Sequence, residues 1–368
     1  MVVPDNDVDD PSAWLSGSSD GEGELDARVP SPPGSSTGAG SLLDTVVIAQ
    51  WEDRAEQGLF RYDVTACPTK VVPGAFGFIA QFNEGRGSKK RPTEFCVDKV
   101  VQPFDAKKFN FTKALQKEVL FQFEARPGGG AIDYEPLAPA GPSPNLVFIN
   151  VSPIEYGHVL LVPRALSSLP QVVDTEALLL ALQFCHQADN PYFRLAFNSL
   201  GAYGTINHLH FQAYYLAVPF AVERAPTVAL RGLKRRRGVH MSALAQYPVR
   251  GLVFEAGDAL GDLAAVVGDA CARLTAANVP HNLFVVDCGQ RLFLFPNGFA
   301  LAKAQGRVPE DLLATQVDPA AFEISGHIIF KRGEDYEAAS QASVWRLLEH
   351  ASLSEAEFLA TARLALDF

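Results

Sequence analysis

Short apolar runs rich in Val, Ile, Leu and Phe recur along the chain, and they restrict it to folds that contain a multistranded sheet. Each run has the length of a strand and is bounded by turn-forming residues. The runs are Leu146–Val151, His158–Pro163, Phe193–Asn198, Asn207–Leu216, Asn282–Asp287, Arg291–Phe295 and Ile324–Phe330. Because the strands come in groups with helices between them, rather than in strict alternation with helices, the pattern predicts an α+β fold.

Three helices are predicted with clear ends. The segment Asp174–Ala188 stops before Pro191, and the segment Asp258–Asn278 stops before Pro280, since proline cannot continue a helix. Ser354 and Glu357 have the spacing of a capping box, which predicts the start of the last helix.

Composition excludes several classes of protein. The 368 residues correspond to about two domains, and 48% apolar residues can fill a large core. No apolar run approaches the roughly 18 residues of a membrane span, so we expect no membrane partner. Residues 1–40 contain eight acidic residues, one Arg and 18 Ser, Gly or Pro, which predicts a disordered acidic tail. The tail accounts for −7 of the net charge of −11, and the remainder lacks the basic excess of a nucleic-acid binder.

The cysteines indicate the compartment. Five scattered cysteines without a CxxC motif argue against a disulfide framework and against a cysteine zinc site. The amino terminus has neither a secretory nor an organellar signal pattern, so we expect a cytoplasmic protein. The one dense basic run, Lys234–Arg237, is interpreted as a solvated loop, with a nuclear-import signal or a partner site as alternatives.

Two histidines and a glutamine alternate along one predicted strand. His208, His210 and Gln212 would project from one face, whereas Leu209 and Phe211 would project from the other. Three interpretations compete: a solvated pair of histidines, a metal site, or a nucleophile with acid–base support. A metal site needs a third ligand that neither Gln212 nor the cysteines supply, so no metal is expected. Histidine chemistry suits neutral pH, which favours the third interpretation.

Neighbouring motifs give this strand its context. The segment Asn150–Pro163, then Asn198-Ser199-Leu200-Gly201, then the strand with His208 and His210 together resemble the histidine-triad superfamily. In that superfamily the strand face binds a nucleotide α-phosphate. Its hydrolases carry a third histidine at the last position of the motif, whereas nucleotidyltransferases of the galactose-1-phosphate uridylyltransferase type carry glutamine, as this chain does at Gln212.

The resemblance is closer to one family within that branch. Residues 41–368 are similar throughout to the plant-type GDP-L-galactose phosphorylases, and the tail 1–40 lies outside the similarity. The matching blocks are Gln50–Arg54, Gly58–Cys67, Gln81–Gly85, Arg91–Phe95, Asp105–Phe123, Ile149–Pro163, Pro191–Ala217, Tyr247–Arg250 and Glu323–Lys331.

The resemblance implies a fold and a reaction. Residues 41–230 would form a catalytic histidine-triad-like half and residues 245–368 a degenerate one, each an antiparallel sheet with packed helices, joined by a basic crossover loop at 231–244. The reaction would be phosphorolysis of a GDP-hexose by inorganic phosphate in ascorbate synthesis. No cofactor is implied, and the chain could form a homodimer.

The resemblance also implies roles for individual residues. His210 would attack the α-phosphorus and form a guanylyl-histidine, with the carbonyl of His208 orienting its ring. Gln212 would hold the phosphate without supplying a proton. Asn198 and Ser199, with the backbone amides of residues 201–205 (Gly201 to Thr205), would hold phosphate oxygens, although this stretch could also be an ordinary loop.

Other polar and aromatic residues are less specific. Asn83 and Arg86 are candidates for binding the diphosphate, in a polar run that could equally be solvated surface. We expect His158 and His327 to have structural roles. The aromatic residues within Phe76–Phe82 and Phe109–Phe123 fit core strands better than a guanine-stacking site.

Three alternative functions remain open at this point. The first is a GDP-D-glucose phosphorylase, which shares the His-x-His-x-Gln chemistry. The second is a GDP-sugar hydrolase. The third is a nucleotide-binding module without turnover, which the presence of both His210 and Gln212 disfavours.

Overall fold

A computed structural model describes residues 41–89, 96–125, 132–135, 143–230 and 236–367 of the chain. The predicted tail and the start of the basic run lie outside these residues. The strands are β1 (Thr69–Val71), β2 (Ile79–Phe82), β3 (Val119–Ala125), β4 (Ile132–Glu135), β5 (Asn145–Ile149), β6 (Val159–Val162), β7 (Phe193–Asn198), β8 (Phe211–Tyr215), β9 (Thr227–Ala229), β10 (His240–Leu244), β11 (Leu252–Glu255), β12 (His281–Val286), β13 (Arg291–Pro296) and β14 (His327–Phe330). The helices are α1 (Leu42–Glu56), α2 (Glu84–Lys89), α3 (Thr175–Ala188), α4 (Leu260–Ala276), α5 (Phe299–Ala304), α6 (Glu310–Ala314), α7 (Ala321–Ser325), α8 (Gly333–Glu337), α9 (Gln341–Glu349) and α10 (Glu355–Leu366).

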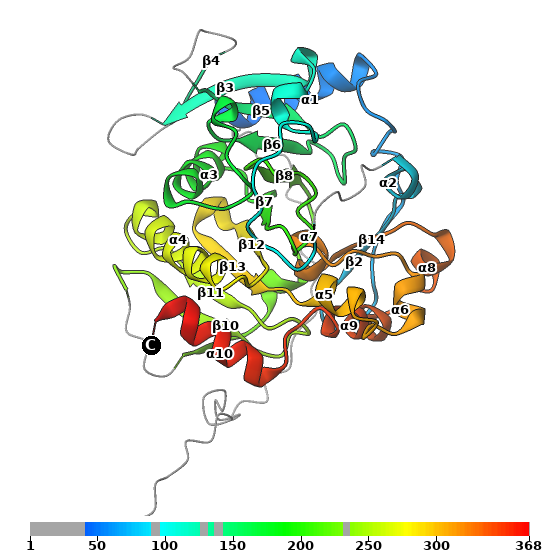
Figure 1. The fold of residues 1–368 in the computed structure, drawn as a ribbon. Helices are drawn as coiled ribbons and strands as arrows, with labels where there is room; N and C mark the ends of the chain where they lie inside the picture. Colours follow the sequence, from blue (N-terminus) through cyan, green and yellow to red (C-terminus); the bar gives the residue numbers. More distant parts are fainter. Residues whose placement is uncertain (1–40, 90–95, 126–131, 136–142, 231–235, 368) are drawn as a thin grey trace, which may run out of the picture.

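One large sheet runs through the molecule (Figure 1). Its 11 strands have the order β4-β3-β5-β6-β8-β7-β12-β13-β11-β10-β9, and neighbouring strands are antiparallel. Strands β3–β8 and strands β10–β13 meet where β7 pairs with β12, with Asn198 opposite Asn282. The predicted bounds differ from the sheet at β9, which belongs to the first half by prediction but pairs with β10 at the far edge of the second. The predicted α+β class with antiparallel sheets and packed helices is therefore confirmed, and the two halves share one sheet.

One face of this sheet is covered by α1, α3, α4 and α10. Alternate residues of each strand point to these helices, such as Leu195 and Phe197 of β7 and Leu283 of β12. Their burial in one continuous core supplies the hydrophobic stabilisation of both halves.

The opposite face carries two separate apolar clusters. A small cluster forms around Phe111, Phe148 and Leu160 in the first half. A larger one joins β12 and β13 to α5, α7, α9 and a three-stranded sheet of order β1-β2-β14. In that small sheet β14 runs parallel to β2, which brings residues from both ends of the described chain together. Polar residues lie between the two clusters.

Most predicted elements are found with small shifts in their bounds. The Asp174 side chain accepts a hydrogen bond from the Ala177 amide at the start of α3. The Ser354 and Glu357 capping box begins α10. The predicted strand 207–216 is shorter, because only Phe211–Tyr215 pairs in the sheet. The predicted loop 231–244 ends in a strand, since residues 240–244 form β10. No helix among the described residues is long and apolar enough to cross a membrane.

Candidate active site

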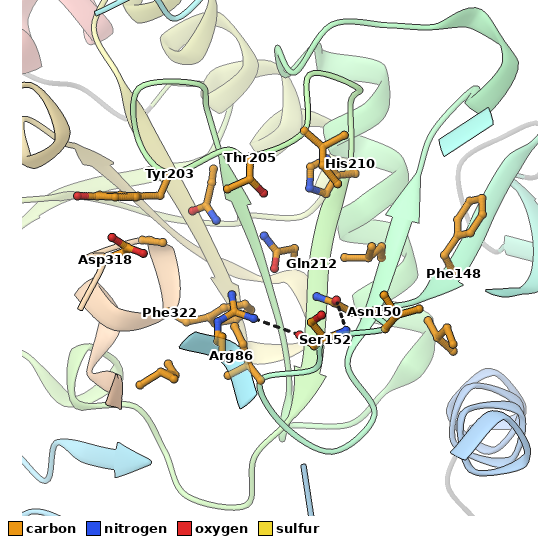
Figure 2. A pocket seen from close by; sticks show the side chains of 18 of the residues that line it. Arg86, Phe148, Asn150, Ser152, Tyr203, Thr205, His210, Gln212, Asp318 and Phe322 are labelled. Atoms are coloured by element: carbon orange, nitrogen blue, oxygen red, sulfur yellow. Dashed lines mark hydrogen bonds between the residues drawn. The ribbon is translucent and has the colours of Figure 1, made fainter. Parts of the chain in front are cut away.

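The polar gap between the two apolar clusters is a pocket of about 1080 Å³, counting the space at its open mouth. Figure 2 shows His210 and Thr205 along one edge, Phe148 on one side and Asp318 with Tyr203 on the opposite side. Gln212 lies at the centre of this view, and Arg86 lies across from His210. The pocket thus has an aromatic side, a charged side and a floor of sheet residues.

His210 is held with one ring nitrogen available for reaction. Its Nδ1 lies 2.8 Å from the backbone oxygen of His208. A carbonyl can only accept, so Nδ1 carries the proton of the neutral ring and Nε2 keeps its lone pair. Burial lowers the pKa of His210 to about 4, which keeps the ring neutral at pH 7. The geometry is that of a poised nitrogen nucleophile.

Gln171 fixes the backbone that carries this histidine. Its side chain accepts from the His210 amide at 3.0 Å and donates to the His210 carbonyl at 3.1 Å. The same Nε2 donates to the carbonyl of Asn198 at 3.1 Å. Gln171 is 1% exposed, so water does not replace these bonds. One side chain therefore sets the spacing between the ends of two strands that contribute to the pocket.

His208 supports the aromatic side of the pocket rather than lining it. Its Nδ1 accepts a hydrogen bond from the Phe111 amide at 3.1 Å. Phe111 then packs 5.2 Å from the ring of His210 and 5.4 Å from that of Phe148, between ring centroids. Burial and the nearby His210 lower the pKa of His208 to about 4. Phe121 and Phe123 are buried in β3, as expected for core strands. Phe109 and Phe111 instead precede β3 and line the pocket, although Phe111 is also buried in the small apolar cluster.

Gln212 forms a side-chain hydrogen bond with His158, a fully buried histidine. The Nδ1 of His158 accepts from the Ile154 amide at 2.8 Å, and its Nε2 lies 3.2 Å from the side-chain Nδ2 of Asn150. Burial, followed by the charge of Arg86, lowers the pKa of His158, whereas a hydrogen bond with Gln212 opposes that shift. His158 is fully buried and does not line the pocket, and its structural role stays a prediction.

The turn after β7 is folded tightly around Asn198. The amides of Ala202 and Gly204 both donate to the Ser199 carbonyl, at 3.1 and 2.9 Å. These two amides are therefore used within the turn, contrary to the expectation that they bind phosphate. A Cβ atom at position 204 would lie 2.7 Å from the backbone carbonyl oxygen of Asn198, so only glycine fits there. The turn places Asn198 and Thr205 at the pocket, while Ser199 and Gly201 do not line it.

Arg86 enters the pocket from α2 and is held by its neighbours. Its amide donates to the Asn83 side-chain oxygen at 3.0 Å, and its guanidinium donates to the Ser152 carbonyl at 3.1 Å (Figure 2). Asn83 is fully buried and does not line the pocket. Asn83 thus holds Arg86 in place, and Arg86 supplies a cation.

The charged side comes from the second half of the chain. Lys331 follows β14 and lies 3.1 Å from Asp318, which also lies 3.9 Å from Lys303. Phe322 and Glu323 of α7 complete this side. Among the described residues, no group of three or more His, Cys, Asp or Glu could hold a metal ion.

Five of the nine candidate residues meet at the pocket: Asn198, Thr205, His210, Gln212 and Arg86. The other four, His208, Ser199, Gly201 and Asn83, do not line it, and Gly201 lines a second, neighbouring cavity. Sequence reasoning missed Gln171, Asp318 and the aromatic side. Glu323 and Lys331 also line the pocket, and they are the first and last residues of one block that carries the resemblance.

A yeast Ap4A phosphorylase has the same fold in three solved structures. A yeast Ap4A phosphorylase in complex with AMP has a TM-score of 0.57 at 12% identity, over 84% of this chain and 96% of that chain. The same enzyme in complex with Ap4A has a TM-score of 0.56. The fold is thus the histidine-triad-like fold of these enzymes.

Family models and curated relatives agree with this class. The model described as GDPGP1-like, N-terminal domain, matches residues 42–214, and GDPGP1-like, C-terminal domain, matches residues 221–368. GDP-L-galactose phosphorylase 1 of Arabidopsis thaliana is 55% identical over 89% of this chain and 74% of its own length. GDP-D-glucose phosphorylase 1 of Homo sapiens is 33% identical over 89% of this chain and 84% of its own length.

The curated relatives place the chain among nucleotidyltransferases of the phosphorylase type. Within that class, the chain belongs to the GDPGP1-like family.

Proposed function

We propose that the protein is a GDP-L-galactose phosphorylase that converts GDP-L-galactose and inorganic phosphate to L-galactose 1-phosphate and GDP, in ascorbate synthesis. The observation that carries this proposal is the His210 ring, which is buried, neutral and bound through Nδ1 to the His208 carbonyl. The identity to the Arabidopsis enzymes, 55% and 56%, supports L-galactose over D-glucose.

The reaction follows from this geometry in two displacements. The Nε2 lone pair of His210 attacks the α-phosphorus of the GDP-hexose, and the P–O bond to the β-phosphate breaks, releasing hexose 1-phosphate. An oxygen of inorganic phosphate then attacks the same phosphorus, and the P–N bond breaks to give GDP and neutral His210.

The division of the pocket supports one orientation of the substrate. Phe109, Phe111 and Phe148 offer aromatic faces against which guanine can pack. Arg86 and Lys331 offer cations to the expelled hexose 1-phosphate and to the incoming inorganic phosphate. The hexose would then extend toward Asp318 and Glu323, whose carboxylates can accept from sugar hydroxyls.

Gln212 favours phosphate over water as the acceptor. An amide donates hydrogen bonds but exchanges no proton near neutral pH. Water attacking the guanylyl-histidine would need a base to remove its proton, whereas phosphate is already an anion at this pH. A GDP-sugar hydrolase is therefore the weaker alternative. A module without turnover is weaker still, because its pocket would not need a poised His210.

The decisive test is capture of the intermediate. Incubation with GDP-L-galactose labelled in the guanylyl group, without phosphate, should label the protein, and added phosphate should release the label as GDP. His210→Asn should abolish both events. His240→Asn, at a half-exposed position on β10, is the matched control and should behave as the wild type. Labelling of His210→Asn would place the nucleophile elsewhere, and a parallel assay with GDP-D-glucose ranks the two sugars.

The compartment and the assembly remain proposals as well. All five cysteines are free thiols, which suits the reducing cytoplasm predicted for the chain. A homodimer is checked by sedimentation of the purified protein, and nuclear entry by localisation of a tagged chain with and without the basic run Lys234–Arg237.

A further inference from the structure

We propose that Asn282 and Asn297, two asparagines of the second half, are positioning residues for the phosphate site. They form a relay of amides that holds the Asn198 carboxamide with its NH₂ group toward the α-phosphate. The inference rests on the proposed function, because it assigns Asn198 to the phosphate of a GDP-hexose.

The orientation of Asn198 is set by a backbone group. The Ala321 amide donates to one side-chain atom of Asn198 at 3.0 Å, and an N–H can only donate, so that atom is the oxygen Oδ1. The Nδ2 of Asn282 donates to the same oxygen at 2.7 Å. The other end of the Asn198 amide is therefore its NH₂ group.

The orientation of Asn282 and Asn297 is fixed in the same way. The Ala202 carbonyl accepts from one atom of Asn282 at 2.8 Å, which identifies that atom as Nδ2. The Phe299 amide donates to Asn297 at 3.0 Å and so identifies Oδ1 of Asn297. The Nδ2 of Asn297 then donates to the Oδ1 of Asn282 at 2.8 Å.

All the hydrogen bonds of the relay run in the same direction, from Asn297 through Asn282 to Asn198, and none of the three amides can be turned over. Asn198, Asn282 and Asn297 are 4%, 0% and 3% exposed, so water does not compete for these bonds. Turning any one amide over would place two donors or two acceptors face to face in a buried site, which is costly. Within the described part of the chain, the Asn198 Nδ2 makes no hydrogen bond, and Asn198 lines the pocket beside His210. Its two N–H groups are thus directed to a ligand.

The relay also explains why the second half contributes to catalysis without a histidine motif of its own. Asn282 lies on β12 directly opposite Asn198 on β7. Asn297 also donates to the Pro319 carbonyl at 2.8 Å, next to Asp318 and α7. A single hydrogen-bonded unit therefore connects the phosphate site to the charged side of the pocket.

The test uses the two diastereomers of a GDP-L-galactose that carries sulfur in place of one non-bridging oxygen of the α-phosphate. Sulfur is a weak acceptor, so the diastereomer with sulfur facing Asn198 should react more slowly in the wild type. The expected ratio of the two rates is about ten- to a hundredfold, the size of one hydrogen bond to a charged group. A ratio of rates is independent of the fraction of active enzyme, so a purely structural defect does not change it.

Asn282→Asp keeps the size of the side chain but removes the donor to Asn198. Its diastereomer ratio should fall toward one, as should that of Asn198→Ala. Asn297→Asp tests the next step of the relay and serves if the first variant does not fold. Asn145→Asp is the matched control: this buried amide on β5 donates to the Phe123 carbonyl and the Glu124 carboxylate and accepts from the Arg164 amide, all outside the pocket, and its ratio should equal that of the wild type.

Two outcomes would overturn the relay: an unchanged ratio in both Asn282→Asp and Asn297→Asp, or an unchanged ratio in Asn198→Ala. Failure of the proposed function is distinguishable, because the wild type would then fail to convert the unmodified GDP-L-galactose and phosphate to GDP.

Discussion

Replacing Gln171 by Glu tests whether one buried amide holds the nucleophile in place. The two side chains have nearly the same shape, and a carboxylate can still accept from the His210 amide. It cannot donate to the carbonyls of His210 and Asn198, which the amide reaches at 3.1 Å each. Two buried acceptors would lose their partners.

The structure sets the size of the effect. An unpaired buried acceptor costs about 1–3 kcal/mol, so two cost about 2–6 kcal/mol. This is a large part of the roughly 5–15 kcal/mol by which a domain is stable. Movement of the His210 backbone should also slow guanylylation, because a 1 Å misplacement of a reacting group can cost about a hundredfold.

The effect of Gln171→Glu should depend on pH with a definite sign. Burial between two carbonyls raises the pKa of the introduced carboxyl above its unfolded value. The loss of stability caused by the substitution is largest at pH values above this raised pKa. It becomes smaller as the pH falls through the raised pKa, because a protonated carboxyl can again donate a hydrogen bond. The loss of stability relative to the wild type should therefore be larger at pH 8 than at pH 5.5.

Urea unfolding at the two pH values, together with single-turnover guanylylation, measures both effects. Gln305→Glu makes the same chemical change at an exposed residue and should stay within about 0.5 kcal/mol of the wild type. A Gln171→Glu protein as stable as the wild type at pH 8, or one that loses more stability on acidification than the wild type does, would refute the role of the amide.

Three further predictions follow from the same site. Gln212→His should shift the products from GDP toward GMP at fixed phosphate, since acid–base help is worth about 10²- to 10⁴-fold; a wild type that makes mainly GMP would instead indicate a hydrolase. Because burial lowers the pKa of His210 to about 4, the guanylylation rate should stay level from pH 8 to about pH 5, and a fall centred at 6.5 would contradict the buried neutral ring. The free energy of unfolding should decrease as pH falls from about 6.5 toward 4, because His210 and His281, with a folded pKa of about 4 each, take up protons only on unfolding; urea titrations that show equal stability at pH 7 and 5 would contradict this.

The alternation in the sequence motif correctly predicted which side chains face the pocket and which face the core. Leu209 and Phe211 are buried in the core beneath the sheet, and His210 and Gln212 point to the pocket, as a period of two requires. This alternation persists through His208 and His210 even though both precede the paired part of β8. Local pattern was sufficient here because one face of this segment is wholly apolar.

Residues that reach the site from distant parts of the chain could not be predicted in this way. Gln171 lies in the loop before α3, and no motif near it in the sequence indicates that its side chain would bond to His210. Asp318 and Lys331 are far in sequence from His210, and Lys331 directly follows β14, which pairs with β2. Phe109 and Phe111 look like core residues in the sequence. The sequence does not distinguish an aromatic residue that only packs in the core from one that also lines a pocket.

The parallel pairing of β14 with β2 has a consequence for synthesis of the protein. Arg86 follows β2 and Lys331 follows β14, so these two cations come together only after the ribosome has synthesised the chain through residue 331. Long-range parallel pairing is slow to form, because the intervening chain must be ordered first. A nascent chain that has not reached residue 331 would therefore contain His210 and Arg86 but lack Lys331, the second cation of the pocket. Under the proposed function, a pulse-labelled translation reaction should show activity only some time after residue 331 has been synthesised.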